Sequence, residues 1–537
     1  MKMKKLYFPL IIFTVFLFSC EKKSFSPALK ESLSKDAKLA NQGFQKSLKF
    51  VHAWLKETDP ETGLIPRNLQ KNKNIWNAKD AAADNYPFMV LTSAFTSQEL
   101  FNGKMMDILE KETEITSRIG ALPDTYNFEK NGFDQEELDT FAILFGSSEY
   151  VKDGLLPLTE WLGTSPWSER MINILDEFQI QAEVVQRGSD GESFGDGLPE
   201  INGELLQILS RIYWMTGKEK YLNWAEKIAD YYLLGENHPT KNFERLRLRD
   251  HGCELISGLC EIYATMHFAR PEKKDIYKEP LYTMLDDILA KGRNEDGLFY
   301  NAINPQTGEV LWDGVADTWG YTLNGFYTIY LLDKKEAYKD AVLKVFAHLD
   351  NYKNFDWEHG SSDGYADAIE SALNLYNRIP DESVASWIDS ETQIMWGKQQ
   401  PSGIIEGWHG DGNFARTTIM YCLWKSKGLA VQPWNEGVNL AAQQSGDSLY
   451  VQISSDINWE GKVLFDTPRH KNNMKMPMDW PRINQFPEWF VVEENAKYQI
   501  TNLSNNTSEQ LLGGLKDNAI KVILKAGETQ QLVVTKL

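Results

Sequence analysis

The sequence predicts a mainly α-helical protein, an (α/α)6 toroid of helical hairpins followed by a small C-terminal antiparallel β domain. Apolar residues recur at helical spacing in about a dozen segments before residue 431. Between many of them lies a turn of an acidic residue, Gly and an apolar or aromatic residue, as in Asp296-Gly297-Leu298 and Asp363-Gly364-Tyr365. Repeated helix–loop units cannot each bury an apolar face alone, so they must stack on one another.

The chain begins with a targeting segment. Lys2, Lys4 and Lys5 precede an apolar run over residues 6–18, which is too short for a comfortable membrane span and leads to Cys20. This order resembles a bacterial lipoprotein signal peptide over residues 1–19, with Cys20 carrying the lipid (a palmitate-type anchor). Residues 20–40 are Lys- and Ser-rich and predict a flexible tether. We therefore expect a protein held in the outer membrane by its lipid alone, on the periplasmic side or at the cell surface.

The predicted toroid covers residues 41–430. Helices are expected at 41–57, 86–112, 134–150, 168–183, 200–215, 219–234, 250–268, 276–291, 318–332, 335–350, 364–378, 382–396 and 413–427. Short polar turns such as Lys218-Glu219-Lys220 join the two helices of a hairpin, and the acidic-Gly turns lie at the opposite end. The turns near Asp296, Asp363 and Asp411 (Asp411-Gly412-Asn413-Phe414) should therefore face one mouth.

Residues 431–537 predict a β-sandwich-like domain. Short alternating or β-branched runs occur at 449–453, 461–465, 489–492, 497–500, 520–524 and 531–534. The proline-rich stretch 467–487 predicts a long ordered loop that packs back on the helical ring.

The composition limits the partners. A formal net charge of −20 argues against nucleic-acid binding, although a local basic pocket could still take an anionic substrate. Cys253, Cys260 and Cys422 have no metal-ligand spacing and are expected as small core residues. The metalloprotease, Walker, dinucleotide-binding and serine-hydrolase motifs are missing, and we expect no metal or cofactor.

The densest polar cluster is Arg245-Leu-Arg247-Leu-Arg249-Asp250-His251. Arg247 and Arg249 could present guanidinium forks to a carboxylate or sulfate, and His251 could act as acid or base. An ion-paired structural loop explains the same cluster equally well.

Further candidates stand at loop–helix junctions. Tyr321 and His409 are possible proton-transfer groups. Residues that could bind a sugar through stacking or polar contacts are Trp76, Asn85, Trp319, His359, Trp408 and Arg416. Helix capping alone could account for Asp317 and for Asp84 with Asn85.

Several stretches together carry a resemblance: 408–416 (WHGDGNFAR), 465–470 (FDTPRH), 480–482 (WPR) and 487–490 (PEWF). With the lipoprotein signal, the toroid and the β domain, the chain resembles carbohydrate-active lipoproteins of marine polysaccharide-degrading bacteria, and among them the oligosaccharide dehydratases of ulvan degradation.

The resemblance implies a carbon–oxygen lyase, free of cofactors, that acts on an anionic oligosaccharide. It removes the C5 proton and the 4-hydroxyl of a non-reducing-end uronic acid to give a 4,5-unsaturated uronate. Arg247 and Arg249 would then hold the substrate carboxylate as charge develops, and His251, Tyr321 and His409 would supply the base and the acid.

Two other classes of protein fit the sequence. A glycoside hydrolase on the same toroid needs two carboxylates, which Asp84, Asp317 and Asp411 could provide. A non-catalytic glycan-binding lipoprotein needs only an aromatic groove.

Overall fold

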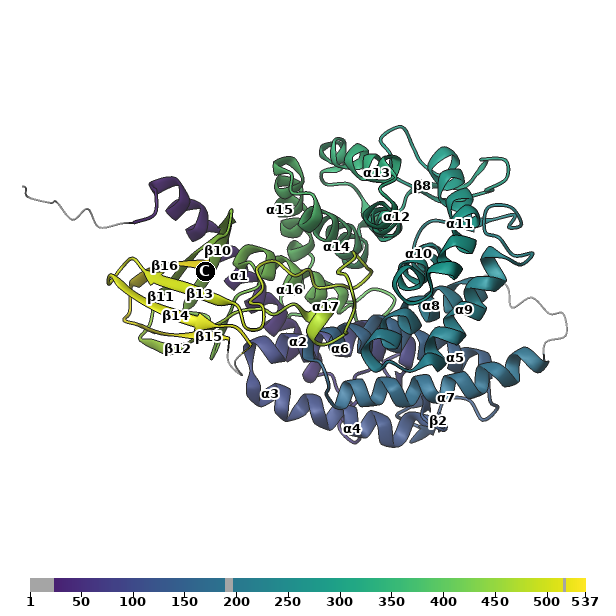
Figure 1. The fold of residues 1–537 in the computed structure, drawn as a ribbon. Coiled ribbons are helices and arrows are strands. Elements are labelled where there is room, and N and C mark those ends of the chain that lie inside the picture. The colour runs from purple at the N-terminus through teal and green to yellow at the C-terminus, as the bar shows by residue number, and fades with distance from the viewer. Residues whose placement is uncertain (1–23, 189–196, 515–517) are drawn as a thin grey trace, which may run out of the picture.

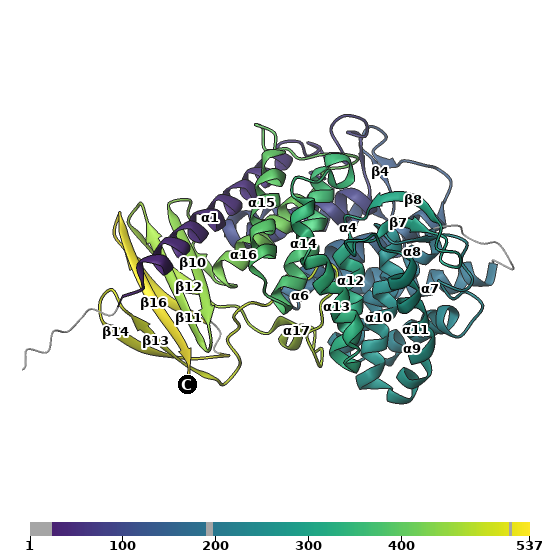
Figure 2. The ribbon, with the colours of Figure 1, turned by 90° about the horizontal axis from the view of Figure 1, so that it is seen from above.

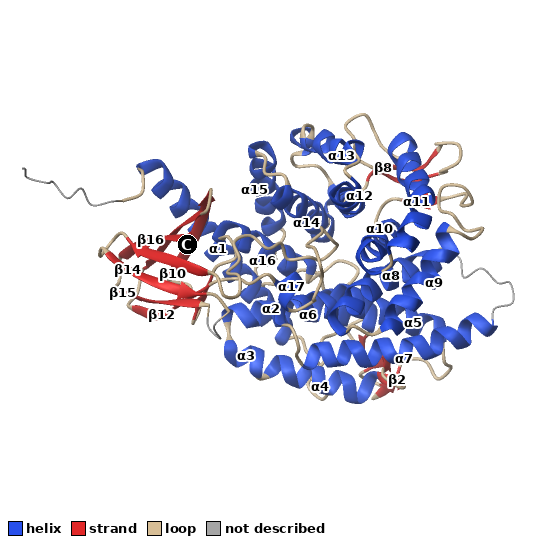
Figure 3. Cartoon of the chain, in the orientation of Figure 1, coloured by secondary structure: helices blue, strands red, loops and turns tan. Residues whose placement is uncertain are grey.

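The computed structural model describes residues 24–188, 197–514 and 518–537. A large body of paired helices carries a β domain at one end (Figure 1), and the two classes of structure are almost completely separated along the molecule (Figure 3). None of the described helices combines the length and apolar character that a membrane span requires. Cys20, which is expected to carry the lipid, and the expected signal peptide lie outside the described residues.

The helical body is built around a closed ring of inner helices, in which each contacts the next and α16 contacts α2. The inner members are η1 (Ala78–Asn85) continued by α2 (Tyr86–Thr96); α5 (Thr140–Glu149) continued by η2 (Tyr150–Leu155) and α6 (Leu156–Leu162); α8 (Gly197–Thr216); α10 (His251–Ala269); α12 (Trp319–Asp333); α14 (Ser362–Arg378); and α16 (Asn413–Ser426). The described residues thus form seven inner segments, one more than the six hairpins expected from the sequence.

Outer helices cover this ring. They are α1 (Pro27–Leu55), α4 (Lys104–Thr116), α7 (Pro166–Gly188), α9 (Glu219–Leu233), α11 (Pro271–Lys291), α13 (Glu336–Phe346) and α15 (Glu382–Gly397), with the short α3 (Gln98–Asn102). Most pack against the inner helix that precedes them, whereas α1 packs against α16, the last helix of the ring. The seventh pair therefore consists of the first and the last helix of the helical region. A sequence pattern of consecutive hairpins does not reveal such a pair.

The α1–α16 pair also corrects the expected tether. Residues 27–40 form the first half of α1, where Leu33 and Ala37 are buried against Ala441 of the β domain. Figure 2 shows α1 running from the β domain along the helical body.

Inner helices approach one another closely because small residues stand at their crossings. A Cβ at Gly203 of α8 would lie 2.3 Å from the backbone nitrogen of Leu255 in α10. A Cβ at Gly258 would lie 2.5 Å from the carbonyl oxygen of Gly203. The two backbones therefore touch, and every residue from 253 to 266 of α10 is buried. Cys253, Cys260 and Cys422 are free and buried, which confirms their expected place in the core.

Several predicted helices are interrupted. The expected helix 86–112 breaks into α2, α3 and α4, and the expected helix 134–150 begins only at Thr140. Asp153-Gly154-Leu155 has the sequence of the acidic-Gly turns, but it lies inside η2 and forms no turn.

Short strands in the loops of the helical body form small antiparallel sheets. These are β1 (Ile75–Trp76), β4 (Tyr126–Asn127) and β5 (Gly132–Phe133); β2 (Ser117–Ile119) and β3 (Leu122–Pro123); and β6 (Leu246–Arg247), β7 (Tyr300–Ile303) and β8 (Val310–Val315). The short helices η3 (Leu349–Tyr352) and η4 (Trp357–Gly360) precede α14.

The chain changes from helices to strands at Ala430. A five-stranded antiparallel sheet of order β10-β11-β16-β13-β14 shares an apolar core with a three-stranded sheet of order β15-β12-β9. The strands are β9 (Ala430–Gln432), β10 (Val438–Ser445), β11 (Ser448–Ser455), β12 (Trp459–Leu464), β13 (Lys497–Asn502), β14 (Thr507–Leu512), β15 (Ala519–Leu524) and β16 (Glu528–Lys536). Residues 489–492 form only one isolated bridge and not the expected strand.

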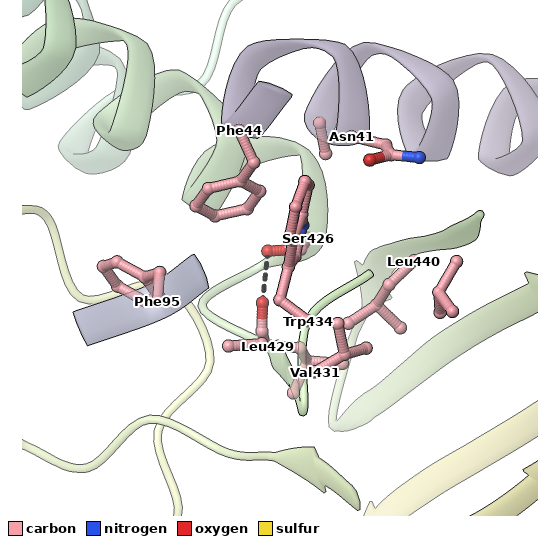
Figure 4. Close-up of a pocket in the computed structure, with 11 residues that line it drawn as sticks. Asn41, Phe44, Phe95, Ser426, Leu429, Val431, Trp434 and Leu440 are labelled. Atoms are coloured by element: carbon pink, nitrogen blue, oxygen red, sulfur yellow. Dashed lines mark hydrogen bonds between the residues drawn. The ribbon is translucent and has the colours of Figure 1, made fainter. Parts of the chain in front are cut away.

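An apolar crevice marks the junction of the helices with the β domain. Phe44 of α1 and Phe95 of α2 face Val431 and Trp434, and the Ser426 hydroxyl donates to the carbonyl oxygen of Leu429 at 2.7 Å (Figure 4). The crevice has a volume of only about 20 Å³, which is room for little more than one water molecule. It is a packing defect of the junction and not a candidate site.

The stretch 467–487 returns to the helical ring, as expected. We call it the strap. It contains the short helix α17 (Arg469–Asn472), and its Trp480 and Phe486 are buried in the core of the helical body. The Trp480 indole donates to Glu261 Oε2 of α10 at 3.2 Å, and the Thr328 hydroxyl of α12 donates to the carbonyl oxygen of Pro481 at 3.4 Å. The strap therefore lies across the C-terminal halves of the inner helices.

Candidate active site

A polar cavity of about 300 Å³ opens at the end of the ring where the inner helices from α10 onward begin. Every inner segment contributes to its wall, and the strap contributes Asn484. The lining residues are Lys79, Asp80, Asp84, Phe145, Glu149, Lys152, Asp153, Glu204, Asp250, Glu254, Thr318, Tyr321, Glu358, Asp363, Asp367, Trp408, His409, Asn413, Arg416 and Asn484.

The cavity is strongly acidic. Ten lining side chains are carboxylates, against four that carry or can carry a positive charge. The helices α10, α12, α14 and α16 all direct their N-terminal ends at this cavity, and the partial positive charge of a helix N-terminus offsets part of the repulsion between carboxylates.

Two π-helical segments, η1 and η2, pack against each other on one side of the cavity. Asp80 and Asp84 come from η1, and Lys152 and Asp153 come from η2. Gly154 makes the contact possible, because a Cβ there would lie 2.7 Å from Cγ of Pro87 and 3.1 Å from the carbonyl oxygen of Ala82. Short π-helical turns often occur at functional sites.

Lys152 organises the carboxylates next to η2. Its buried ammonium donates to Asp153 Oδ1 at 2.7 Å and to Glu254 Oε1 of α10 at 2.6 Å. The Gln207 amide of α8 donates to Glu254 Oε2 at 2.5 Å. Carboxylate oxygens of Glu149, Asp153 and Glu204 lie within 4.8 Å of one another. Three helices thus place several carboxylates around one ammonium group.

Glu149 and Asp153 differ in their affinity for a proton. Burial, followed by the charges of Glu204 and Asp153, raises the pKa of Glu149 well above its usual range. Burial acts in the same direction on Asp153, but the Lys152 ammonium and hydrogen bonds from Glu149 and Lys152 outweigh it and lower the pKa of Asp153. The opposed shifts favour the proton on Glu149 and the negative charge on Asp153. Such opposed pairs mark acid and base roles in enzymes.

A second network lies between α12, α14 and α16. The Tyr321 hydroxyl is 2.8 Å from Asp367 Oδ1 and 2.9 Å from Glu370 Oε2, and it accepts a hydrogen bond from Arg416 Nη2 at 3.2 Å. Arg416 also donates to Asp367 Oδ1 at 2.6 Å and to Asn484 Oδ1 at 2.9 Å. Burial raises the pKa of Tyr321 well above its usual range, so this hydroxyl is not a base at neutral pH.

His409 lies beside Asp84 of η1 at the edge of the cavity. Its Nε2 lies 3.6 Å from Asp84 Oδ2, and its Nδ1 lies 3.1 Å from the carbonyl oxygen of Gly410. Burial alone would lower the pKa of His409, but the carboxylates of Asp84 and Asp80 outweigh burial and raise it to about 9. His409 is therefore protonated at neutral pH and can act as an acid but not as a base.

The structure brings together four of the residues singled out in the sequence: Tyr321, Trp408, His409 and Arg416 all line the cavity. His251 is the first residue of α10, and its side chain is not among the side chains that the structure describes. The other predicted sugar-binding residues do not line the cavity, and they are Trp76, Asn85, Arg247, Arg249, Trp319 and His359.

The two arginines are held in ion pairs. Arg247 donates to Asp250 Oδ2 at 3.2 Å. Arg249 is buried, donates to Asp317 Oδ2 at 3.3 Å and to Glu358, and lies over the ring of Trp312. They form the ion-paired loop that was the alternative explanation of their cluster.

The other predicted residues are mostly buried. Trp76 and Trp319 belong to the apolar core. Asn85 is fully buried behind Gly410, and His359 is exposed on η4. Of the three aspartates considered for a hydrolase, only Asp84 lines the cavity. Burial raises the pKa of Asp317 and of Asp411 to about 7.

Two groups beside the cavity have the ligand types of a cation site. In one, Asp80, Asp84 and His409 offer ligand atoms within 4.8 Å of one another, and in the other Glu149, Asp153 and Glu204 do. The Lys152 ammonium and the protonated His409 already supply positive charge there. The expectation that the protein needs no metal or cofactor stays a prediction.

Sequence reasoning missed the residues around Lys152. Glu149, Lys152 and Asp153 interrupt an apolar run from Phe141 to Leu158, and charged residues inside such a run are a signal of a buried polar site. Asn484 and Glu204 carry no comparable signal, because only the fold brings the strap and α8 to the cavity.

No family model and no curated protein matches the chain. Solved structures that resemble it include a family 76 glycoside hydrolase from a bovine Bacteroides thetaiotaomicron strain (12% identity, 42% of this chain and 56% of that chain, TM-score 0.31). Another is the GH76A α-1,6-mannanase of Salegentibacter sp. HEL1_6 (12% identity, 58% of this chain and 95% of that chain, TM-score 0.40). A third is the unsaturated glucuronyl hydrolase of Bacillus sp. GL1 (12% identity, 54% of this chain and 86% of that chain, TM-score 0.37). Likenesses at this level do not assign the chain to a family.

Proposed function

We propose that this protein is a glycan-processing enzyme, a glycoside hydrolase in which Glu149 is the acid and Asp153 the ionised carboxylate. The observation that carries the proposal is the pairing of these two side chains in one cavity, where Lys152 and Asn484 both donate to Asp153 and the pKa values of the two carboxyl groups shift in opposite directions. Two such carboxyl groups are the chemical requirement of most glycosidases.

The geometry suggests the course of the reaction. Protonated Glu149 would donate its proton to the glycosidic oxygen as the bond to the leaving sugar breaks. Asp153 would attack the anomeric carbon, and water would later release the sugar. The Glu149 carboxyl group is hydrogen-bonded to Asp153 in this structure, so the two groups must separate to the roughly 5 Å of retaining enzymes when a sugar enters between them. Attack by Asp153 and then by water are two displacements at the anomeric carbon. The proposal therefore includes net retention of the anomeric configuration.

Asp153 is held in its ionised form by its neighbours. Lys152 donates to Oδ1 at 2.7 Å and Asn484 donates to the same oxygen at 2.5 Å. These donors stabilise negative charge before the reaction and again when the covalent intermediate is hydrolysed.

The dehydratase reaction implied by the family resemblance has less support. It would place a uronate carboxylate in a cavity with ten carboxylates, whereas the expected clamp of Arg247 and Arg249 does not line the cavity. Arg416, which does, is already engaged by Asp367. The cavity therefore favours an uncharged sugar at the reacting position.

Product analysis of purified protein tests the proposal. We expect new reducing ends from an oligosaccharide with a neutral terminal sugar, with the anomeric configuration retained in early NMR spectra. Accumulation of a conjugated, ultraviolet-absorbing unsaturated uronate without chain cleavage would instead establish dehydration. Binding with no chemical change would establish a glycan-binding protein.

The anchoring at the outer membrane through Cys20 is a further part of the proposal. A lipid there would hold the enzyme at the membrane surface. Metabolic labelling with a palmitate analogue, compared with the Cys20→Ala variant, tests the anchor.

A further inference from the structure

Trp408 is a large apolar side chain presented to solvent at the cavity mouth, with 77% of its surface exposed. Its backbone is nevertheless held firmly. The Asn68 amide donates to the carbonyl oxygen of Trp408 at 2.7 Å, and the Gly410 backbone donates to the carbonyl oxygen of Arg67 at 2.7 Å. Glu406 accepts from the Leu69 backbone at 2.8 Å. The two loops are thus hydrogen-bonded to each other, and the indole projects as a platform from a backbone that is held in place.

Two lysines lie near this platform, Lys71 beside the Trp408 ring and Lys79 in the cavity lining that includes both Phe145 and Trp408. The Lys71 ammonium lies 5.6 Å from the centre of the Trp408 ring, and the Lys79 ammonium lies 5.6 Å from that of Phe145. Both lysines are exposed, and neither ammonium is within 4.0 Å of a carboxylate in the described parts of the chain. Their neighbour Arg67, in contrast, donates to Asp80 at 2.6 Å. The mouth therefore carries cations with no protein counter-charge, whereas the cavity behind it is rich in carboxylates.

An aromatic face with adjacent cations matches one chemical class of ligand. The flat face of a pyranose ring packs on an indole, and an ammonium group pairs with a sulfate ester or a carboxylate. We infer that Trp408, Lys71 and Lys79 form an accessory subsite for an anionic sugar, joined to the sugar that occupies the cavity. The inference rests on the proposed function, since it assumes a glycan in the cavity.

The subsite gives the substrate a direction and a charge pattern. A neutral terminal sugar enters the acidic cavity, and the negatively charged next sugar stays at the mouth. With a net charge of −20, the protein repels a polyanion at long range, so local cations are needed to hold this unit. The inference therefore keeps the expectation of an anionic oligosaccharide substrate, but it places the negative charge outside the cavity.

Binding experiments test the subsite without requiring turnover. The Glu149→Gln variant would be titrated with two oligosaccharides that share a neutral terminal sugar and differ only in one anionic group on the next sugar. In one pair, the second sugar would carry a sulfate ester in one ligand and a free hydroxyl in the other. In another pair, it would be a uronate in one ligand and the methyl ester of that uronate in the other. Isothermal calorimetry would give the affinities, and failure of the hydrolase assignment would leave this measurement valid.

We expect the anionic ligand of at least one pair to bind about tenfold more tightly than its neutral partner, with the difference shrinking at high salt. Lys71→Gln combined with Lys79→Gln should abolish the difference. Trp408→Ala should weaken both ligands of the pair, and Trp408→Phe should restore most of the affinity. Lys278→Gln is the matched control, because Lys278 also lies over an aromatic ring (Tyr282, 5.6 Å) but on the outer helix α11. Equal affinities for all charged and neutral ligands, or an unchanged preference in the double variant, would overturn the inference.

Discussion

The Asn484 amide nitrogen lies 2.5 Å from Asp153 Oδ1, although 331 residues separate the two in the sequence. The backbone nitrogen of Asn484 also donates to Glu370 Oε1 at 2.7 Å, and its side-chain oxygen accepts from Arg416. One residue of the strap thus connects the carboxylate cluster of η2 with the Tyr321–Arg416 network. The strap is therefore part of the site as well as part of the packing.

Replacing Asn484 with Ala should weaken the ionised form of Asp153. A hydrogen bond to a charged group contributes about 1.5–3 kcal/mol, so the acidic limb of the pH–activity profile should move to higher pH by about one unit or more. The change is measured as kcat/KM against pH. Asn472→Ala in α17 is the control, and an unmoved acidic limb in the Asn484 variant would contradict the role.

Asp153→Asn should remove the attacking carboxylate with little change in shape. We expect kcat to fall by about 10³-fold, with the thermal unfolding transition preserved in circular dichroism. Asp447→Asn, on the exposed turn between β10 and β11, should retain full activity. An active Asp153→Asn enzyme would exclude the proposed mechanism.

The pH dependence follows from the two directions of shift. Activity requires protonated Glu149, so it should fall as pH rises through the raised pKa of this group. It also requires ionised Asp153, so it should fall as pH drops through the lowered pKa of Asp153. In Glu149→Gln the residual activity should lose its alkaline limb and keep its acidic one. Retention of both limbs would assign the acid to another residue.

His409 should make the stability depend on pH. Its pKa is raised from 6.5 to about 9, so its contribution is complete below pH 6.5 and is lost as pH rises through 9. The contribution amounts to roughly 3 kcal/mol at low pH. Urea unfolding at pH 6 and pH 10 should show wild type losing more stability than His409→Asn over this interval. Parallel losses in the two proteins would show that His409 is not the responsible group.

Gly154→Ala should separate η1 from η2. The new methyl would meet Pro87 at 2.7 Å, and overpacking of this kind costs about 1–3 kcal/mol. Because the displaced segment carries Asp153, kcat should fall together with the unfolding temperature. Gly397→Ala at the end of α15 is the control, since a Cβ there meets nothing within 4 Å. If Gly154→Ala matched the control in both measurements, the contact would not matter.

The main features of the fold were predictable because they depend on local patterns. Helical periodicity and glycine turns indicated the paired helices, and alternating runs indicated the β domain. The first half of α1 was missed because Lys and Ser dominate its composition, although Leu29, Leu33, Ala37 and Ala40 stand at helical spacing. The seventh inner segment was missed because its outer partner comes from the opposite end of the helical region.

The candidate site was predictable only in part. Tyr321, His409 and Arg416 stand near the starts of helices or just before them, where the loop end of a ring must open. Lys152 and Asp153 lie within a helical segment, and Asp153-Gly154 has the sequence of a turn. Only the π-helical geometry and the contact with η1 reveal why the glycine is needed there.

The strap also determines how material can move through the ring. In the described part of the chain, it crosses the C-terminal halves of the inner helices, while the cavity opens at their N-terminal ends. In these described residues, the strap thus covers the end of the ring opposite the cavity mouth. Under the proposed function, a glycan chain would enter and leave by the same mouth, and each product would have to leave before the next chain end arrives. Turnover would then proceed by separate encounters and not by processive sliding along one chain.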